Sequence, residues 1–333
     1  MKVLVTGGIG NVGTQVIARL SGHGHDVTVI GRRPGMNVPG AQYRRCDVTD
    51  IDGLAAVTRG MDAVVHLAAF GNPGMGTPDV IFRVNCQGTM NVYEAAARCG
   101  IRRVVTASSI NALGYGFGVR EWDIRYFPID EDHPTFTTDA YSFSKTIVEE
   151  IGRFWWRRED ISGASLRLPA VAMPPGSGEE SIRGTVGRLR AEFAALKALS
   201  PAERARKVDD WMARLLKTRE ARTVEHPPRP TFSSDLPLMI GRQDFWTAVD
   251  DRDAAQGVEK ALTVPYEGCH VLFLNDSHNW AGIASVELVE YLYPKVKTWK
   301  RPVAGTESLV SIERARKLLG YEPEYSASRF YEL

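Results

Sequence analysis

The sequence has little of what defines several broad classes of protein. Its four cysteines, at positions 46, 86, 99 and 269, lie far apart, and its seven histidines form no ligand motif. We therefore predict neither a disulfide framework nor a metal site. No apolar run approaches the roughly 18 residues of a membrane-spanning helix, and no secretory leader pattern follows Met1. These absences lead us to expect a cytoplasmic protein that binds neither membrane nor metal.

The sequence also lacks an excess of charge of either sign. Lys and Arg number 41 against 40 Asp and Glu, which gives a net charge of +1. We expect no general attraction to nucleic acid or to an anionic membrane, so any recognition of anions must be local. Apolar residues make up 44% and charged residues 24% of the 333 residues, which is typical of a folded globular protein.

The first 170 residues alternate short apolar strands with amphipathic helices. Buried apolar strands that alternate with helices form a parallel sheet covered on both faces. The predicted fold class is therefore α/β, a doubly wound parallel sheet of the Rossmann type. We predict strands at 2–6, 27–30, 63–67, 104–108 and 164–168, a short strand ending near Asp47, and helices ending near Leu20 and spanning about 79–99 and 140–158.

A different composition begins after Pro169. We predict a dinucleotide-binding domain over 1–170 and a smaller, mixed α/β substrate-binding region over 171–333, which returns to the first domain near 240–262. A helical insertion at about 181–222 is expected because apolar residues recur there at intervals of three and four. Those in its first helix are Ile182, Val186, Leu189, Phe193 and Leu196.

The same insertion is locally basic. It carries 11 Lys and Arg against 5 Asp and Glu, a balance of 11 − 5 = +6. Ser200 and Glu203 have the spacing of a capping box, which predicts the start of a second helix. Two interpretations remain open for the charge: solvated polar faces, or a cover over the cleft whose positive field attracts an anionic substrate.

Glycines recur at intervals of three directly after the first strand, at Gly7, Gly10 and Gly13. At this place the chain must turn sharply, let its backbone approach a pyrophosphate and offer helix N-terminal N–H groups to the negative charge. A dinucleotide-binding loop that includes Asn11 and Val12 is therefore favoured over a glycine turn without a ligand.

The second strand ends in Gly31-Arg32-Arg33, without the carboxylate that would bind the ribose hydroxyls of NAD. Two guanidinium groups stand where the 2′-phosphate of NADP would lie, and they can form charge-assisted hydrogen bonds to it. The pattern favours NADP as the cofactor. NAD remains the alternative if both arginines simply face solvent.

Tyr141 and Lys145 are four residues apart and so lie on one face of a predicted helix. An isolated tyrosine has a pKa near 10, and a nearby ammonium group and an oxidised nicotinamide both favour the phenolate. Tyr141 could then exchange a proton with a substrate oxygen. Tyr291 and Tyr293 also precede lysines by four residues, but Tyr141 alone follows a strand ending in Ser109. Ser109 is either a ligand of the same oxygen or a helix cap.

These residues belong to a collinear series that resembles the extended short-chain dehydrogenase/reductase family, the NAD(P)-dependent epimerase/dehydratase type. The series includes Thr6-Gly7-Gly8-x-Gly10-x-x-Gly13, Asp47-Val48, His66-Leu67-Ala68-Ala69, Asn85-x-x-Gly88-Thr89, Ser108-Ser109, Tyr141-x-x-x-Lys145 and Arg167-Leu168-Pro169. The resemblance implies further cofactor contacts from Asp47, Val48, Leu67, Ala68, Ala69, Asn85, Ala107 and Pro169. It also implies a homodimer, for which Trp155 and Trp156 are either anchors or core residues.

The sequence departs from the family pattern after Ser109. Ile110 and Asn111 stand where sugar-nucleotide dehydratases carry an Asp-Glu pair, so that elimination chemistry lacks its acid and base. A long aromatic segment then leads to Tyr141, and it is either a wall over the substrate or a self-packed surface loop. From this segment we expect Asn111 and Tyr115 to contact the substrate.

The sequence thus predicts an NADP-preferring oxidoreductase with Ser109, Tyr141 and Lys145 as its catalytic residues. It would interconvert a hydroxyl and a carbonyl group on a small polar or sugar-derived substrate. A nucleotide-sugar epimerase that retains NAD(P) is one alternative, because it would use the same three residues. A non-catalytic NADP-sensing protein is another, since a fold does not fix a function.

Overall fold

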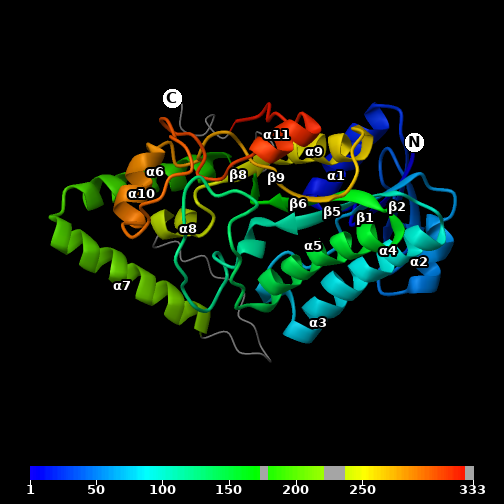
Figure 1. The fold of residues 1–333 in the computed structure, drawn as a ribbon, viewed down its shortest axis with the longest axis horizontal. Coiled ribbons are helices and arrows are strands. Elements are labelled where there is room, and N and C mark those ends of the chain that lie inside the picture. Colours follow the sequence, from blue (N-terminus) through cyan, green and yellow to red (C-terminus); the bar gives the residue numbers. More distant parts are fainter. Residues whose placement is uncertain (173–178, 221–236, 327–333) are drawn as a thin grey trace.

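The computed structural model describes residues 1–172, 179–220 and 237–326. A sheet of seven parallel strands forms its centre, in the order β3-β2-β1-β4-β5-β6-β9 (Figure 1). This arrangement confirms the predicted doubly wound parallel sheet. The strands are β1 (Lys2–Thr6), β2 (Asp26–Gly31), β3 (Gln42–Arg45), β4 (Ala63–His66), β5 (Arg103–Ser109), β6 (Ser162–Leu168) and β9 (Cys269–Phe273).

Helices cover both faces of this sheet. One face carries α1 (Asn11–Gly22) and α9 (Asp251–Thr263), and the other carries α2 (Ile51–Thr58), α4 (Gly88–Arg98) and α5 (Ala140–Glu159). Side chains alternate between the faces along each strand, so Val3 and Val5 join the core on the α1 side while Leu4 joins the core under α4. Two hydrophobic cores therefore hold the sheet from both sides.

The predicted helix at 79–99 is divided into three parts. It comprises α3 (Pro78–Phe82), a π-helical turn η2 (Arg83–Gln87) and α4. Single π-turns widen a helix locally and are frequent at functional sites. Here the turn contains the fully buried Asn85, whose side chain reaches two neighbouring segments.

The second half of the chain contributes shorter elements. They are β7 (Ala170–Ala172), α6 (Glu179–Lys197), α7 (Pro201–Glu220), α8 (Pro237–Gln243), β8 (Ala248–Asp250), α10 (Ser285–Leu292) and α11 (Glu313–Leu319), with 3-10 turns η1 (Pro73–Met75) and η3 (Ile110–Leu113) in the first half. Strand β7 pairs with β8 in a separate parallel sheet. Strand β8 begins only at Ala248, because Phe245 and Trp246 before it adopt left-handed backbone angles.

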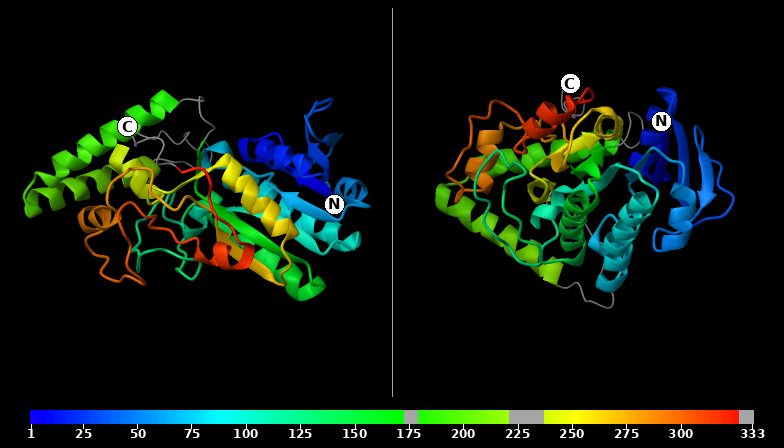
Figure 2. Two further views of the ribbon diagram at one scale, coloured as in Figure 1. Left: turned by 90° about the horizontal axis from the view of Figure 1, so that it is seen from above. Right: turned by 45° about the vertical axis from the view of Figure 1, so that its right-hand side comes forward.

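Helices α6 and α7 diverge from a turn at Ser200 and project from the end of the molecule opposite the N-terminal strands (Figures 1 and 2). The predicted capping box is confirmed, because Ser200 N donates to Glu203 Oε2 at 3.1 Å and Glu203 N donates to Ser200 Oγ at 3.4 Å. Val186, Leu189, Phe193 and Leu196 are buried as the periodicity predicts. The side chain of Ile182 and residues 221–222 lie outside the described part of the chain.

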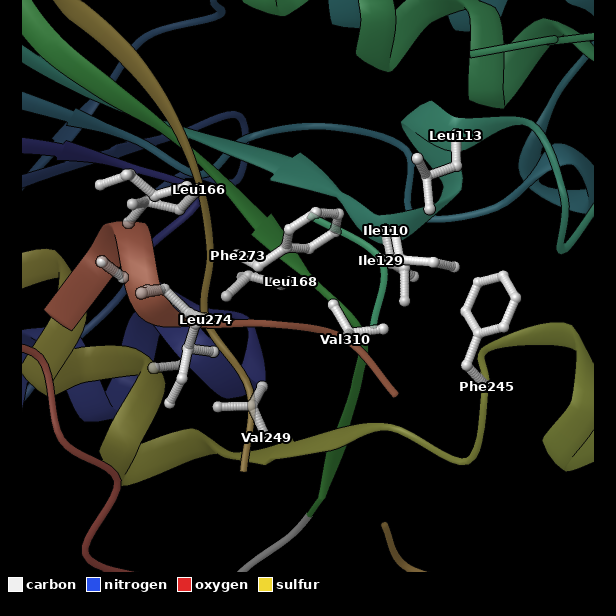
Figure 3. Packing of buried hydrophobic residues seen from close by; sticks show 14 of the residues in the cluster. Ile110, Leu113, Ile129, Leu166, Leu168, Phe245, Val249, Phe273, Leu274 and Val310 are labelled. Atoms are coloured by element: carbon white, nitrogen blue, oxygen red, sulfur yellow. The ribbon is translucent and has the colours of Figure 1, made fainter. Parts of the chain in front are cut away.

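Residues from the second half extend the core to the ends of the central strands. Figure 3 shows Phe245, Val249 and Leu274 in the same hydrophobic cluster as Leu166 and Leu168 of β6. The carboxyl end of the sheet is therefore joined by apolar packing to the segment that follows α8. In the described ranges, no helix is long and apolar enough to cross a membrane, and no three His, Cys, Asp or Glu side chains are grouped to hold a metal ion.

Candidate active site

A cavity of about 580 Å³ opens at the carboxyl ends of β5 and β6. Ligands of doubly wound sheets bind outside the carboxyl ends of the strands, so this is the expected place. Of the residues predicted for the site, it brings together Leu67, Ala69, Ala107, Ser109, Asn111, Tyr141, Lys145 and Pro169. Other described residues in its wall are Gly71, Ser108, Ile110, Gly116, Phe117, Leu168, Ala170, Val171, Ile240, Gln243, Asp244 and Trp280.

Helix α5 presents Tyr141 and Lys145 to this cavity. The helix begins there because the Asp139 carboxylate accepts a hydrogen bond from Ser142 N at 2.9 Å, an N-cap. Lys145 is 3% exposed, and its Nζ donates to Ala107 O at 2.8 Å. That nitrogen lies 5.8 Å from the centroid of the Tyr141 ring.

The pKa values of these two groups move in opposite directions. Burial raises the pKa of Tyr141 to about 12, although a hydrogen bond with Ser109 opposes this rise. Burial lowers the pKa of Lys145 to about 8, while Cys86 and Glu149 act in the opposite direction. The ammonium group of Lys145 alone therefore does not lower the pKa of Tyr141 as predicted. A further positive charge in the cavity is needed to favour the phenolate.

A buried ion pair lies below Lys145. Arg167 of β6 donates to both carboxylate oxygens of Glu149 at 2.8 Å, and Ser108 Oγ donates to Glu149 Oε1 at 2.6 Å. Glu149 is one helical turn after Lys145, and both members of the pair are 3% exposed. The pair fixes α5 against β5 and β6, and it places a negative charge near the ammonium group of Lys145.

The glycine loop has the shape that a pyrophosphate requires. Gly7 has a φ of +73°, and a Cβ atom there would lie 2.5 Å from Ala68 N. A Cβ atom on Gly13 would lie 2.5 Å from Gly7 O. Gly10 is the N-cap residue of α1 and provides no side-chain hydrogen bond. The first backbone N–H groups of this helix can therefore bind an external anion. The loop, together with Asn11 and Val12, fits a dinucleotide phosphate.

Arg32 and Arg33 follow β2 on the surface, and both are exposed. Tyr43 Oη donates to Arg33 O at 2.5 Å and Arg45 Nε donates to Arg32 O at 3.2 Å, so β3 holds their backbone. Among the described residues, neither guanidinium group forms an ion pair with a carboxylate.

Asp47 and Val48 follow β3 at the same edge of the sheet. Asp47 Oδ1 accepts hydrogen bonds from Thr49 N and Thr49 Oγ1, both at 2.9 Å. Val48 is buried, and its carbonyl accepts from Asn91 Nδ2 at 3.0 Å. These contacts shape the turn where the adenine is expected.

Asn85 supports the cavity and is not among the residues that line it. Its Oδ1 accepts from Phe70 N at 2.8 Å, and its Nδ2 donates to Ser144 Oγ at 2.9 Å. The fully buried amide therefore ties the loop after β4 to helix α5. The neighbouring His66 bridges Thr6 and Thr89 at 2.7 and 3.0 Å, and burial lowers its pKa to about 3.

The structure does not bring Tyr115 to the cavity, which corrects its expected contact with the substrate. The ring is 6% exposed and stacks on Phe245 at a centroid distance of 5.1 Å. The two residues that follow it, Gly116 and Phe117, line the cavity instead. Phe117 meets the Tyr141 ring edge-on at 5.7 Å. The aromatic segment thus combines both expected roles, since part of it forms a wall and part of it is self-packed.

Several residues of the site carry no sequence signal. Ile240, Gln243, Asp244 and Trp280 reach the cavity from the second half of the chain. Arg219, near the end of α7, is 4% exposed and donates to Gly118 O at 3.0 Å and Tyr115 O at 3.3 Å, on either side of Phe117. Only their position in the folded chain identifies these residues.

The glycine loop, the carboxyl-end cavity and the Tyr-Lys pair define a dinucleotide-dependent class of protein. The model of the NAD dependent epimerase/dehydratase family matches residues 3–212. The chain belongs to this family, as the collinear motifs predict.

Particular relatives match about half of the chain. It is 36% identical over 160 residues to a UDP-glucose 4-epimerase of Streptomyces lividans, covering 45% of this chain and 46% of that protein. It is 33% identical over 175 residues to an L-arabinose 1-dehydrogenase (NAD(P)(+)) of Haloferax volcanii, covering 50% and 66%. The chain thus spans about half to two thirds of the length of these relatives.

The fold extends over the whole chain in solved structures. A short-chain dehydrogenase/reductase superfamily protein from Agrobacterium tumefaciens with bound NAD aligns with a TM-score of 0.65 at 23% identity. The alignment covers 99% of this chain and 94% of that one. At this identity the likeness establishes the fold alone.

Proposed function

We propose that this protein is an NAD(P)-dependent oxidoreductase that interconverts a hydroxyl and a carbonyl group on a sugar-derived substrate, with a preference for NADP. The observation that carries the proposal is the presence of Ser109, Tyr141 and Lys145 in one cavity at the carboxyl end of the sheet. The epimerase and sugar dehydrogenase among its relatives support a sugar-derived substrate.

Two side chains would act on the substrate oxygen, and Lys145 would act through Tyr141. Tyr141 exchanges a proton with it, and Ser109 donates a hydrogen bond that holds it. A cofactor bound at the glycine loop supplies the hydride transfer that side chains cannot perform. Lys145, with a pKa lowered to about 8, stays cationic at neutral pH and stabilises negative charge on Tyr141.

Replacement of Tyr141 tests this assignment. We expect Tyr141→Phe to reduce turnover by about two to four orders of magnitude, because the proton-transfer group is lost with little change in packing. NADPH oxidation should be followed with a panel of carbonyl compounds and sugars, with cofactor affinity measured in parallel. Tyr291→Phe on α10 is the matched control and should keep turnover within twofold. Near-normal turnover of Tyr141→Phe rules the mechanism out.

The preference for NADP is proposed on Arg32 and Arg33, which are exposed and free of ion pairs within the described ranges. Replacing both with Ala should weaken NADPH binding on the order of 100-fold while NADH binding changes little. Titration of both cofactors by fluorescence measures the difference. Equal losses, or a wild-type preference for NADH, would refute this part of the proposal.

A nucleotide-sugar epimerase is the second candidate, favoured by the 36% identity to a UDP-glucose 4-epimerase. An epimerase completes an oxidation and a reduction in one cycle, so it releases no reduced cofactor. Purified protein that retains a dinucleotide and converts a nucleotide sugar without net NADPH turnover supports this alternative. Cofactor binding without any chemistry would instead indicate a sensing protein.

We also propose a homodimer and a division of the chain near residue 170. Trp155 is only 6% exposed, so it belongs to the core and cannot serve as an interface anchor. Phe143 and Phe154 on the same helix are 46% and 38% exposed and are better suited to a partner surface. Sedimentation velocity of the wild type and of Phe143→Ser/Phe154→Ser tests the dimer, which the double variant should weaken.

A further inference from the structure

The cavity wall behind α8 contains a carboxyl group that the proposed mechanism does not use. Asp244 lines the cavity, and its Oδ1 atom is buried without a hydrogen-bond partner in the described part of the chain. Burial raises the pKa of Asp244 well above its usual value, although hydrogen bonds from Trp280 and from backbone N–H groups oppose this rise. A buried polar group without a partner destabilises a folded protein, so its position calls for a ligand.

The backbone around Asp244 is strained. Phe245 and Trp246 follow it with φ values of 59° and 51°, in a region that bulky residues rarely adopt. Both rings are fully buried, and Trp246 N donates to Gly241 O at 2.7 Å, so packing and this bond compensate for the strain. Consecutive strained residues are typical of functional sites that require one backbone path. This path leaves Gln243 and Asp244 at the cavity.

The neighbouring groups suit hydroxyl groups better than anions. Gln243 offers an amide that can both donate and accept, and Trp280 offers an indole N–H and a flat apolar face. A hydrogen bond from Trp280 to Asp244 links these two side chains. Lys145 is the one cation among the described lining residues, and its Nζ is already bonded to Ala107 O. A carboxylate or phosphate at this wall would therefore find no counterion other than Lys145 among the described lining residues.

We propose that Gln243, Asp244 and Trp280 form a hydroxyl-recognising subsite for an uncharged, polyhydroxylated part of the substrate. Asp244 accepts hydrogen bonds from substrate hydroxyl groups, Gln243 completes their pairing, and the Trp280 ring packs against the C–H face. The inference rests on the proposed function and deepens it. It replaces the idea of an anionic substrate attracted by α6 and α7, since neither helix contributes a described residue to the cavity wall.

Two matched sugar pairs test the subsite: D-galactose with D-galacturonate, and D-glucose with D-glucuronate. Each pair differs by a carboxylate that replaces a hydroxymethyl group. With saturating NADP⁺, we expect the wild type to prefer the uncharged sugar at least tenfold in kcat/KM. Asp244→Asn should raise KM for the uncharged sugar about tenfold, keep kcat within threefold, and reduce the preference to less than threefold. A wild-type preference for the uronate, or an unchanged preference in Asp244→Asn, overturns the inference.

Thermal unfolding separates recognition from a merely structural role. Because burial penalises the charged form of Asp244 and an amide carries no such charge, Asp244→Asn without sugar should have a higher Tm than the wild type. A structural role would instead lower Tm and reduce kcat for all four sugars alike. Asp52→Asn, at a carboxylate that is 92% exposed, is the matched control and should change neither kinetics nor Tm.

The proposed function and the proposed subsite can be refuted independently of each other. Turnover that persists in Tyr141→Phe defeats the proposed function whatever Asp244 does. If no sugar is turned over, calorimetric titration of the NADP⁺-bound protein with the same four sugars still decides the subsite. Tighter binding of the uncharged sugars that is lost in Asp244→Asn supports it. Any other order of affinities, or no binding, overturns it.

Discussion

The two sides of the cavity are built in different ways. On the cofactor side, formed by β1, β2 and the glycine loop, backbone lies directly against backbone, and neither Gly7 nor Gly13 leaves room for a Cβ atom. On the substrate side, formed by α8 and the loop around Phe117, buried arginine side chains hold the wall from behind. Arg219 donates to Gly118 O beside Phe117, and Arg242 of α8 donates to Leu292 O of α10. Direct backbone contact leaves a glycine pattern in the sequence, whereas contact through long side chains leaves none.

The largest effect should follow from the loss of one carboxylate beneath Lys145, where α5 meets β5 and β6. Glu149→Gln leaves Arg167 buried without its charged partner, which should lower the free energy of unfolding by about 3–5 kcal/mol. Asp210→Asn on α7 removes an exposed partner of Arg214 at 3.8 Å and should cost less than about 1 kcal/mol. Urea unfolding measures both values. Equal losses would mean that burial does not decide how much an ion pair contributes to the stability of this chain.

Glycine substitutions test the backbone contacts of the cofactor side. In Gly13→Ala the new Cβ atom would lie 2.5 Å from Gly7 O, so the loop must move. We expect NADPH affinity to fall on the order of 100-fold, or about 3 kcal/mol. Gly187→Ala in α6 meets no atom within 4 Å and should stabilise the helix by about 0.5–1 kcal/mol. Fluorescence titration measures the NADPH affinity of Gly13→Ala, and thermal unfolding measures the stability of Gly187→Ala. Unimpaired NADPH binding by Gly13→Ala would contradict a tightly packed loop.

Low pH should reduce the stability of the folded chain through His66, which lies on the cofactor side. Its pKa is lowered from 6.5 to about 3, so below pH 6.5 the unfolded chain binds a proton that the folded chain rejects. Stability is therefore lost as the pH falls from 6.5 towards 3, and about 2 kcal/mol of this loss should be present at pH 5. His66→Gln should flatten this part of the stability profile in denaturant titrations from pH 7 to pH 5. An identical slope in the variant would show that other groups cause the acid sensitivity.

The smallest effect is expected where a side chain holds the substrate side. Arg219→Ala removes the hydrogen bonds to Tyr115 O and Gly118 O, which leaves the Phe117 wall less fixed. We expect KM for the substrate to rise about fivefold, or about 1 kcal/mol, with NADPH affinity unchanged. Arg188→Ala on the exposed face of α6 serves as the control in steady-state kinetics. A change in NADPH affinity without a change in KM would show that Arg219 supports the cofactor side and not the substrate side.

The cofactor side could be predicted because its constraints act at fixed short spacings. The glycine loop, the strand ends and the Tyr141-Lys145 interval all lie within single strand-to-helix units. Periodicity also located α6 and α7. Asp244 and Trp280 could not be found in this way, because residues so far apart in sequence meet only through tertiary packing. The site of Tyr115 was misplaced for the same reason, since an aromatic ring next to a cavity residue can equally face the core.

The position of β9 in the sheet also determines the order in which the strands can pair during synthesis. Strand β6 pairs with β5 on one side, but its other neighbour, β9, is synthesised only after helices α6 to α9. During synthesis, β6 therefore presents an open edge, the kind of surface through which nascent chains associate wrongly. The pairing of β6 with β9 therefore forms late. It joins residues that are far apart in the sequence, and such contacts slow folding. Phe273 N then donates to Glu131 Oε1 at 2.9 Å, so the outer edge of the last strand is capped once it arrives.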